Sequence, residues 1–446
     1  KRLIEQINKN KLKIEDLRNE RDEIDDENCK FIMGYFCQYL IENDRLFFTE
    51  EEFVKICKPF AEEQYNSTNL HNLLQVLINN QILEAINAQL QFKIVCWVSY
   101  FAANRMINDD EFAKYMFEEK NAVYNADLID FYTGITGRNE DAITKITGLL
   151  KEQAKIVYEH LGIDKEFNPF DNIKWRQNET IQGVTQKQLE EKIQSSRMPD
   201  DIKEAVADSS FDSVRPYSQQ IYTFFDKYEV RNLMQLLTSA SRALRNSEFV
   251  YPKLREQLAE SIFAGWEILM RVLVYISPLM AKNGFGGFGG ANFKLDKSFS
   301  KNYAECLKQI IVAMPYNIIL WYKNDFYSDK LTLLLKKYLM EHENEFIRHL
   351  VALIICSARP REFENLISPY IGSLGKNTYY LGDLYSSLCL NYSFDFMSGH
   401  ELRQTENLIK SCYMKHLTGS TEPGPATIAK FERMQGKLPD RKSFEE

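Results

Sequence analysis

The sequence predicts a mainly α-helical protein, and three observations support that prediction. The chain has 19 glycines among 446 residues, about 4% against a usual value of about 7%. Few glycines mean few tight turns, which disfavours a many-turned β-sandwich. Apolar residues recur three or four positions apart over most of the chain, and helix-capping signals precede several of these runs. The length exceeds that of one ordinary core and predicts about three domains.

The first 28 residues are dense in charge, with apolar positions at helical spacing. This pattern predicts an amphipathic helix, or the end of a helical bundle that begins upstream. Because the first residue is Lys1 rather than Met, we expect either that a start was removed or that the chain is part of a longer protein.

Residues 29–108 have the pattern of a winged-helix-like domain. An apolar helix over residues 29–41 is followed by Thr49 and Glu52, spaced as a capping box that begins a second helix. Asn66 begins a third. Residues 82–86 and 90–92 then flank a short turn, which suits a β-hairpin. An aromatic helix over residues 95–106 follows it. Two short helices before a hairpin are the layout of a winged helix.

The next segments predict a helical extension and then a linker. Residues 109–165 are helical in pattern, with a capping residue at Asn139. Residues 166–216 are polar, rich in Gln and interrupted by Pro169, Pro199 and Pro216. We expect a linker with one or two short helices, and a domain boundary.

Residues 217–417 predict an irregular α-helical repeat array, which we interpret as a sensor. The helices pair into hairpins, but no residue-level repeat is visible. Residues 418–446 are polar, with two prolines, and are expected to form a flexible tail. The expected helices cover residues 219–226, 229–246, 252–277, 299–314, 317–322, 329–341, 343–357, 360–370, 379–390 and 399–416.

Charge, cysteine content and hydropathy limit the class of protein. The formal net charge is −8, so nucleic acid is a disfavoured partner. Eight cysteines without C-x-x-C spacing favour buried thiols in a cytoplasmic protein over disulfides or a zinc site. The most apolar stretch, residues 262–280, contains Glu267 and Arg271, four positions apart. We expect these to pair inside a buried core helix rather than in a membrane span.

A glycine-rich segment over residues 283–292 is the most unusual local feature. It contains five glycines and two phenylalanines, but no Lys follows a Gly and no apolar strand precedes it. A phosphate-binding loop needs both. The simplest interpretation is a flexible loop between two helices. The alternative hypothesis is that Phe285 and Phe288 are exposed aromatic residues that dock on a partner.

No motif in the chain predicts a catalytic, cofactor-binding or metal site. Gly375 and Lys376 lack the upstream glycine and the following Ser or Thr of a Walker loop. His342 and His349 lie two helical turns apart, too far to chelate one metal. Neither a Gly-x-Ser-x-Gly elbow nor a His-Glu-x-x-His helix is present.

Residues 92–103 resemble the segment that closes the winged-helix domain of STAND (NACHT-type) NTPases. The family's histidine, which can sense the nucleotide, falls on Ile94, whose side chain cannot hydrogen-bond a phosphate. The resemblance covers about residues 29–150. The residues that fit the family pattern are Phe92, Lys93, Trp97, Tyr100, Phe101, Ala102 and Ala103.

The resemblance implies a longer protein with an effector domain, an ATPase core, this winged helix and a helical sensor. No Walker motif occurs here, so ATP or ADP and Mg²⁺ are expected only in an upstream domain, and no cofactor in this chain. The implied partner is a protein trigger, phage-encoded in many bacterial members, whose recognition lets the ATPase form a homo-oligomer. No membrane partner is implied.

Three other functions remain open. The first is a free-standing helical-repeat scaffold for protein partners. The second is an enzyme whose site is divided among helices, for instance a nuclease. The third is winged-helix DNA binding, which is disfavoured because the expected recognition helix, residues 67–79, has no Lys or Arg.

Overall fold

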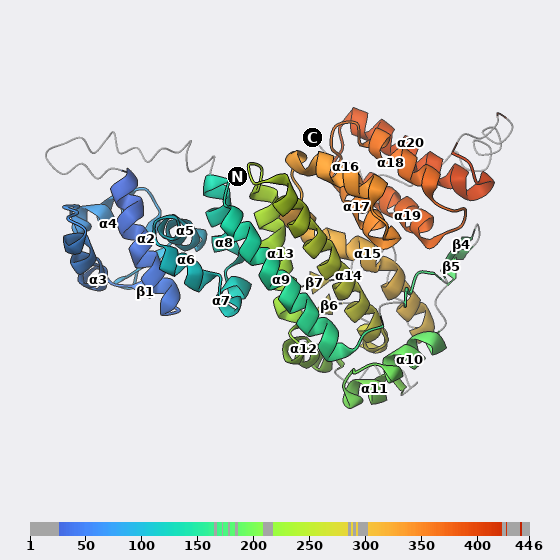
Figure 1. Ribbon diagram of the computed structural model, residues 1–446, viewed down its shortest axis with the longest axis horizontal. Coiled ribbons are helices and arrows are strands. Elements are labelled where there is room, and N and C mark those ends of the chain that lie inside the picture. Colours follow the sequence, from blue (N-terminus) through green and yellow to red (C-terminus); the bar gives the residue numbers. More distant parts are fainter. Residues whose placement is uncertain are drawn as a thin grey trace. The chain divides into compact units, whose positions relative to one another are not determined.

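The computed structural model describes residues 26–164, 167–171, 173–176, 179–182, 186–207, 217–283, 287–288, 291–292, 302–421, 425 and 438. Helices α2 to α20 dominate these residues (Figure 1), so the prediction of a mainly α protein is confirmed. The chain divides into two compact units. Unit 1 consists of Lys1–Thr147 and Arg242–Arg255, and unit 2 of Gly148–Ser241 and Glu256–Glu446.

The division falls inside three helices, α9 (Glu140–Leu161), α13 (Val230–Asn246) and α14 (Pro252–Asn283). The first boundary, after Thr147, therefore lies within the helical extension expected over residues 109–165. The segments expected to be a bundle end and a flexible tail, residues 1–28 and 418–446, lie mostly outside the described residues.

Unit 1 contains short helices around a small three-stranded sheet. Helix α5 packs against both α2 and α8. The other elements of this unit follow one another along the chain without long connections. The elements are α2 (Asp26–Glu42), β1 (Phe47–Phe48), α3 (Glu50–Glu63), α4 (Leu70–Asn79), β2 (Leu83–Ile86), β3 (Gln89–Phe92), α5 (Cys96–Asn108), α6 (Asp110–Met116), α7 (Glu119–Tyr124) and α8 (Ala126–Thr136).

The sheet of unit 1 has the strand order β1-β3-β2, and its strands are antiparallel. The hairpin predicted over residues 82–92 is confirmed. Its turn has two residues, Asn87 and Ala88, because Gln89 pairs with Ile86 across the ladder. Both turn residues have positive φ, as expected of the turn that matches the twist of a two-residue hairpin.

Helix α3 begins as predicted at Thr49, whose hydroxyl accepts a hydrogen bond of 3.2 Å from the Glu52 backbone N–H. The second half of the expected capping box is replaced, because the Glu52 carboxylate pairs with Arg45. The predicted cap at Asn139 is also confirmed, since its Oδ1 accepts from the Ala142 N–H at 2.9 Å. Helix α4 is capped by Asn69 rather than Asn66.

Unit 2 contains most of α9, α13 and α14, the described parts of residues 166–216, helix α12 and the helices that follow α14. Helices α15, α17 and α19 pack on one another, and α20 packs on α18 and α19. The elements are β4 (Lys174–Arg176), β5 (Glu179–Gln182), α10 (Gln186–Ser195), α11 (Asp200–Ala207), α12 (Tyr217–Lys227), β6 (Gly287–Phe288), β7 (Ala291–Asn292), α15 (Tyr303–Phe326), a 3-10 turn (Asp329–Leu331), α16 (Thr332–Glu341), α17 (Glu345–Ala358), α18 (Phe363–Ser373), α19 (Tyr379–Phe394) and α20 (Gly399–Thr418).

In the segment expected to be a linker, residues 166–216, β4 and α10 each have buried apolar side chains. Trp175 of β4 is 5% exposed and stacks on the His416 ring of α20 at a centroid distance of 4.1 Å. Leu189 and Ile193 of α10 are fully buried. The polar composition that suggested a linker arises from the solvent side of these elements, while a few apolar residues anchor them.

Two helices expected on either side of Pro315 form one continuous helix, α15. Proline removes one backbone N–H donor and crowds the preceding turn, so a break was the simplest expectation. Side chains supply donors in that turn. Tyr379 Oη donates to the Val312 carbonyl at 2.7 Å, and Asn317 Nδ2 donates to the Ala313 carbonyl at 2.8 Å.

Among the described residues, one helix is long and apolar enough to cross a membrane, namely α14 over Pro252–Lys282. Of its most apolar window, 78% is buried inside the protein. Arg271 Nη2 donates to Glu267 Oε1 at 2.8 Å, as predicted from their spacing. Burial of the window and internal pairing of its charges are properties of a core helix.

Candidate functional site

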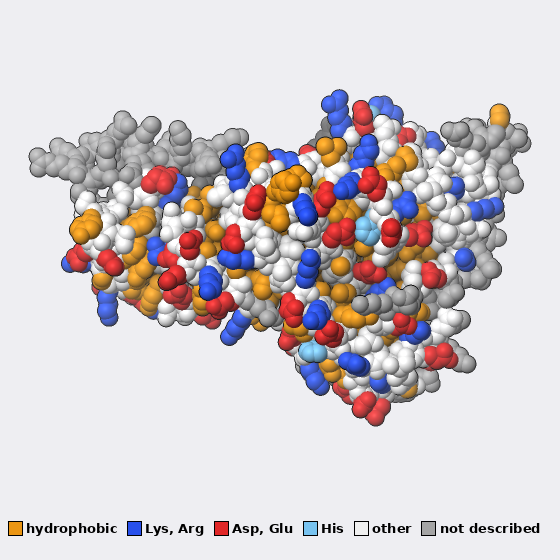
Figure 2. Space-filling view, viewed as in Figure 1, with side chains coloured by type: hydrophobic (Ala, Val, Ile, Leu, Met, Phe, Trp, Pro, Cys, Tyr) orange, Lys and Arg blue, Asp and Glu red, His pale blue; other side chains and the backbone are white. Residues whose placement is uncertain are grey.

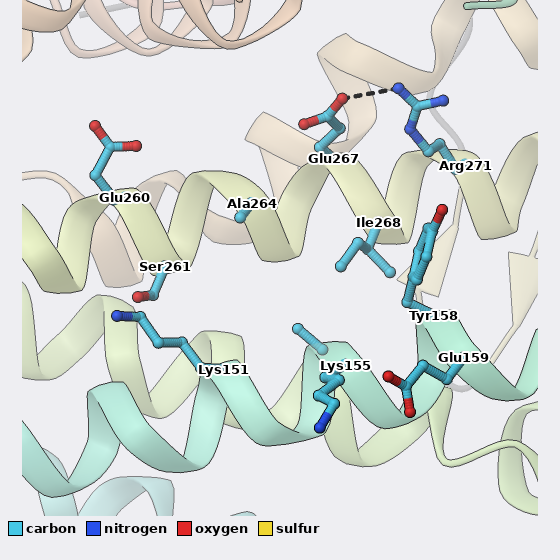
Figure 3. Close-up of a pocket in the computed structure, with 11 residues that line it drawn as sticks. Lys151, Lys155, Tyr158, Glu159, Glu260, Ser261, Ala264, Glu267, Ile268 and Arg271 are labelled. Carbon is cyan, nitrogen blue, oxygen red and sulfur yellow. Dashed lines mark hydrogen bonds and ion pairs between the residues drawn. The ribbon is translucent and has the colours of Figure 1, made fainter. Parts of the chain in front are cut away.

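A groove of about 710 Å³ lies between helices α9 and α14 in unit 2 (Figure 3). Its volume falls in the range of pockets that hold a bound group, about 300–1,000 Å³. The two helices run side by side, with Lys151 and Ser261 toward one end and Tyr158 and Arg271 toward the other. Helix α9 contributes Lys151, Ala154, Lys155, Tyr158 and Glu159, and α14 contributes Glu260, Ser261, Ala264, Glu267, Ile268 and Arg271.

Helical periodicity explains why these residues share one groove. Lys151, Lys155 and Tyr158 are spaced by four and three positions, so they lie along one face of α9. The lining residues of α14 follow the same spacing from Glu260 to Arg271. At 1.5 Å per residue, these eleven steps give a groove about 16 Å long, or three helical turns.

Small residues on α14 let the neighbouring helices approach closely at the base of the groove. A Cβ added at Gly265 would lie 2.7 Å from Leu237 Cδ2 and 3.7 Å from Leu150 Cδ1. These contacts bring α13 and α9 against the same point of α14. Ala264, the preceding residue, faces the groove and is exposed.

At the end of the groove that holds Lys151, the two walls carry charges of opposite sign. Lys151 and Lys155 of α9 are exposed, and neither has an ion-pair partner within the described part of the chain. Glu260 of α14 is exposed, with His342 Nε2 at 3.5 Å from its Oε2. The α9 wall is therefore cationic over one helical turn, while the α14 wall opposite it offers a carboxylate.

Arg271 and Glu267 form an internally satisfied pair rather than free charges. Arg271 Nη1 also donates to the Asp164 carbonyl at 3.0 Å and to the Phe167 carbonyl at 2.6 Å. Glu267 Oε2 accepts from Asn344 Nδ2 at 3.2 Å. Asn344 also caps α17, so the groove is connected to the C-terminal helices by hydrogen bonds.

The lining combines a floor of small and apolar side chains with charged walls, and it contains no histidine or cysteine. In the residues that the structure describes, no group of three His, Cys, Asp or Glu side chains could hold a metal ion. Burial raises the pKa of Cys306 to about 11 and that of Cys389 to about 12, so these thiols stay protonated at neutral pH.

The aromatic segment that carries the resemblance lies at the centre of unit 1. Phe92 and Phe101 are 6% and 3% exposed, and their ring centroids are 6.2 Å apart. Trp97 stacks on Phe101 at 5.9 Å. Tyr100 meets Phe131 of α8 edge to face at 5.7 Å, and burial raises the pKa of its hydroxyl. These five rings join β3, α5 and α8.

Lys93 and Ile94 differ from the aromatic residues around them because both are exposed. Lys93 Nζ donates to Gln81 Oε1 at 2.9 Å, and its backbone N–H donates to the Ile82 carbonyl at 2.9 Å. Lys93 thus fastens the end of the hairpin. Ile94 is 54% exposed and the adjacent Val95 is 59% exposed. Two neighbouring apolar side chains therefore lie on the surface of unit 1.

Of the two phenylalanines that were expected to dock on a partner, the structure describes the backbone of one. Phe285 lies outside the described residues. Phe288 belongs to β6, which pairs with β7 through Phe288 and Ala291. This short ladder replaces part of the loop that was expected between two helices.

No family model, curated protein or solved structure matches this chain. Its function must therefore be argued from its own residues. On the viewed face, Lys and Arg side chains are intermixed with Asp and Glu (Figure 2). That distribution does not provide the single-sign stripe that follows a phosphate backbone.

Sequence reasoning did not find the groove or a buried polar cluster in unit 2. His349 is fully buried, with Nε2 at 2.7 Å from Asp383 Oδ2 and Nδ1 at 3.2 Å from Tyr370 Oη. His349 is one of the two histidines whose spacing argued against a shared metal, and the structure places it in the core. Its partners are 21 and 34 residues away in the chain, so local spacing gave no signal.

Proposed function

We propose that this chain is the regulatory and sensor region of a STAND-type NTPase that acts in antiviral defence in the cytoplasm. In this proposal, unit 1 contains the winged-helix module, and the helices of unit 2 form the array that recognises a trigger protein. Recognition would control the homo-oligomerisation of an ATPase encoded upstream. ATP or ADP with Mg²⁺ would bind that upstream domain.

One observation carries the proposal. Helices α3 and α4 are followed by the β2–β3 hairpin and by α5, and the aromatic residues of α5 pack between the hairpin and α8. This is the element order expected of a winged helix that ends in the family's aromatic segment. The exposed Ile94 stands where the family has its histidine, so the proposal assigns no nucleotide contact to that position.

The regulation follows from differential binding. A trigger shifts a closed-to-open equilibrium only by the amount that it binds the open state more tightly. To move a population from 1:99 to 99:1 requires a preference of about 10⁴-fold. A trigger that binds the helix array equally well in the closed and the open state would leave the closed-to-open equilibrium of the ATPase unchanged.

The genomic sequence upstream of Lys1 tests the proposal directly. We expect it to encode Gly-x4-Gly-Lys-Ser/Thr within a few hundred residues, together with a Walker B strand. The full-length protein, expressed in bacteria, should then lower phage plaque formation, and substitution of the Walker lysine should abolish that protection. A start codon just before Lys1 would contradict the proposal.

A helical-repeat scaffold is the second candidate function, and the groove between α9 and α14 favours it. The groove offers a binding surface that needs no ATPase. The same upstream sequence separates the two functions, because a scaffold that stands alone has no Walker motif before it. Partner binding without any trigger-dependent oligomerisation would favour the scaffold.

A further inference from the structure

We propose that the groove between α9 and α14 binds an amphipathic helix of a protein partner, and that this helix presents acidic residues one turn apart to Lys151 and Lys155. The inference rests on the proposed function, because it names the kind of segment that the trigger would present. It depends on four properties of the groove. They are its length, the small residues of its floor, the unpaired lysines of α9 and the negative charge of Glu260 on α14.

The length and the floor suit a helix. A groove of three turns between two helices that run side by side accommodates a third helix of similar length. Helices pack at interaxial distances of about 8–10 Å, and small residues permit the closest approach. Ala154, Ser261 and Ala264 provide such a floor, while Ile268 and Tyr158 give an apolar anchor at one end.

The two lysines determine which side chains the partner helix needs along one of its edges. Lys151 and Lys155 are four residues apart, exposed and without an ion-pair partner within the described part of the chain. Carboxylates spaced by four residues on a partner helix would meet both ammonium groups at once. Glu260 on the facing wall would accept a basic residue on the opposite edge of the same helix.

The carboxylates of the groove also argue against a small polyanion. Glu260 of α14 and Glu159 of α9 line the same cavity as the two lysines, and Glu267 lies there paired with Arg271. A phosphorylated ligand small enough to lie between the walls would approach these carboxylates and be repelled. A helix separates its acidic and basic edges by its own diameter, about 10 Å, and so satisfies both walls.

A display selection with the full chain as bait tests the inference. The probe is a library of helix-favouring peptides, about five turns long, randomised on three faces. We expect enriched sequences to carry Asp or Glu at positions i and i+4. Their affinity should fall at least about tenfold when Lys151→Glu and Lys155→Glu are combined, because two attractive pairs become repulsive.

A matched control separates local from global charge effects. Lys336→Glu combined with Lys410→Glu changes the net charge equally, at exposed lysines outside the groove, and should leave affinity unchanged. Ala264→Trp should block binding by filling the floor. Peptides in which the two acidic residues are replaced by lysine should bind the Lys151→Glu, Lys155→Glu chain and not the wild type.

Several results would overturn the inference. One is that the wild-type chain enriches no peptides relative to the Lys151→Glu, Lys155→Glu chain. Another is that the enriched peptides lack Asp or Glu at positions i and i+4. A third is that peptide binding survives both Ala264→Trp and the charge reversal. The proposed function can be refuted independently of the groove. Groove-dependent peptides combined with no upstream Walker motif would leave the groove assignment intact, whereas trigger-dependent oligomerisation that is unaffected by Ala264→Trp would refute only the groove.

Discussion

His349, Asp383 and Tyr370 show how individual polar residues hold the helices of unit 2 together. They come from α17, α19 and α18, and the imidazole accepts or donates at both nitrogens. A buried carboxylate is stable only with a partner. The histidine is therefore a structural residue that joins three helices through two hydrogen bonds.

Removing this histidine should destabilise the protein strongly. We expect His349→Leu to lower the free energy of unfolding by about 2–3 kcal/mol, because Asp383 loses its one hydrogen-bond partner found in the described structure. Urea denaturation measures the change. The double variant His349→Leu, Asp383→Leu should lose less than the sum of the single variants. Strict additivity would show that the two side chains do not interact.

His416 predicts a dependence of stability on pH. Burial, together with the nearby positive charge of Lys376, lowers the pKa of His416 below its usual 6.5. The unfolded chain then binds the proton more readily than the folded chain. Stability is full above about pH 6.5 and falls as the pH is lowered toward the folded pKa. His416→Phe keeps a ring on Trp175 and should flatten this slope.

The measurement is the thermal midpoint from about pH 5 to pH 7, where histidine titrates. His400→Phe, at an exposed histidine for comparison, should retain the wild-type slope. An identical slope in His416→Phe and wild type would assign the pH dependence to other groups.

For individual residues, the sequence predicted contacts between neighbours on one helix and missed contacts between different elements. The Thr49 cap, the Asn139 cap and the Glu267–Arg271 pair follow from spacings of three or four residues on one helix. His349 and Trp175 have partners on other elements. Local periodicity holds no information about which helices meet, so neither contact could be derived.

At the scale of elements, strand β4 depends on one glycine of α19. A Cβ added at Gly382 would lie 3.0 Å from both Cβ and Cγ of Trp175. The Trp175 backbone N–H also donates to the Asn377 carbonyl at 2.9 Å. The tryptophan therefore cannot retreat without breaking the attachment of its strand.

Gly382→Ala should displace Trp175 and lower stability by about 1–3 kcal/mol through overpacking. Near-ultraviolet circular dichroism and the unfolding midpoint report the two effects. Gly372→Ala is the matched control, since nothing lies within 4 Å of its added Cβ. That control should be neutral or slightly stabilising because alanine is the better helix former. Equal behaviour of the two variants would contradict the close contact.

The sequence predicted most helices of unit 2, because each has its own apolar periodicity. The prediction that α15 breaks at Pro315 was wrong, since donors from Tyr379 and Asn317 sustain the turn before it. The groove could not be predicted because α9 and α14 are separated by about a hundred residues of chain. Its floor residues, such as Ala154 and Ala264, are ordinary in any helix.

At the scale of the whole molecule, unit 1 is built from two separate parts of the chain. Asp130 of α8 connects them. Its carboxylate accepts two bonds of 3.0 Å from Arg245 Nη2 and one of 2.7 Å from Asn246 Nδ2. The Phe249 backbone N–H donates to the Gly137 carbonyl nearby.

Asp130→Ala should loosen the second part of unit 1, Arg242–Arg255. We expect a loss of about 1–2 kcal/mol and faster hydrogen exchange in that segment, because several charge-assisted bonds disappear together. Asp127→Ala is the control. Its carboxylate is 64% exposed and pairs with Arg242, and exposed pairs contribute about 0–1 kcal/mol. Unchanged exchange in Asp130→Ala would contradict the connecting role.

The two-part construction of unit 1 has a consequence for synthesis on the ribosome. When Thr147 emerges, the last segment of its unit does not yet exist, because residues 148–241 must be translated first. At about 5–20 residues per second, that delay is on the order of ten seconds. The nascent chain therefore presents α8 without Arg245 and Asn246 for that time. Cotranslational folding of unit 1 can finish only after residues 148–241 of unit 2 have left the exit tunnel.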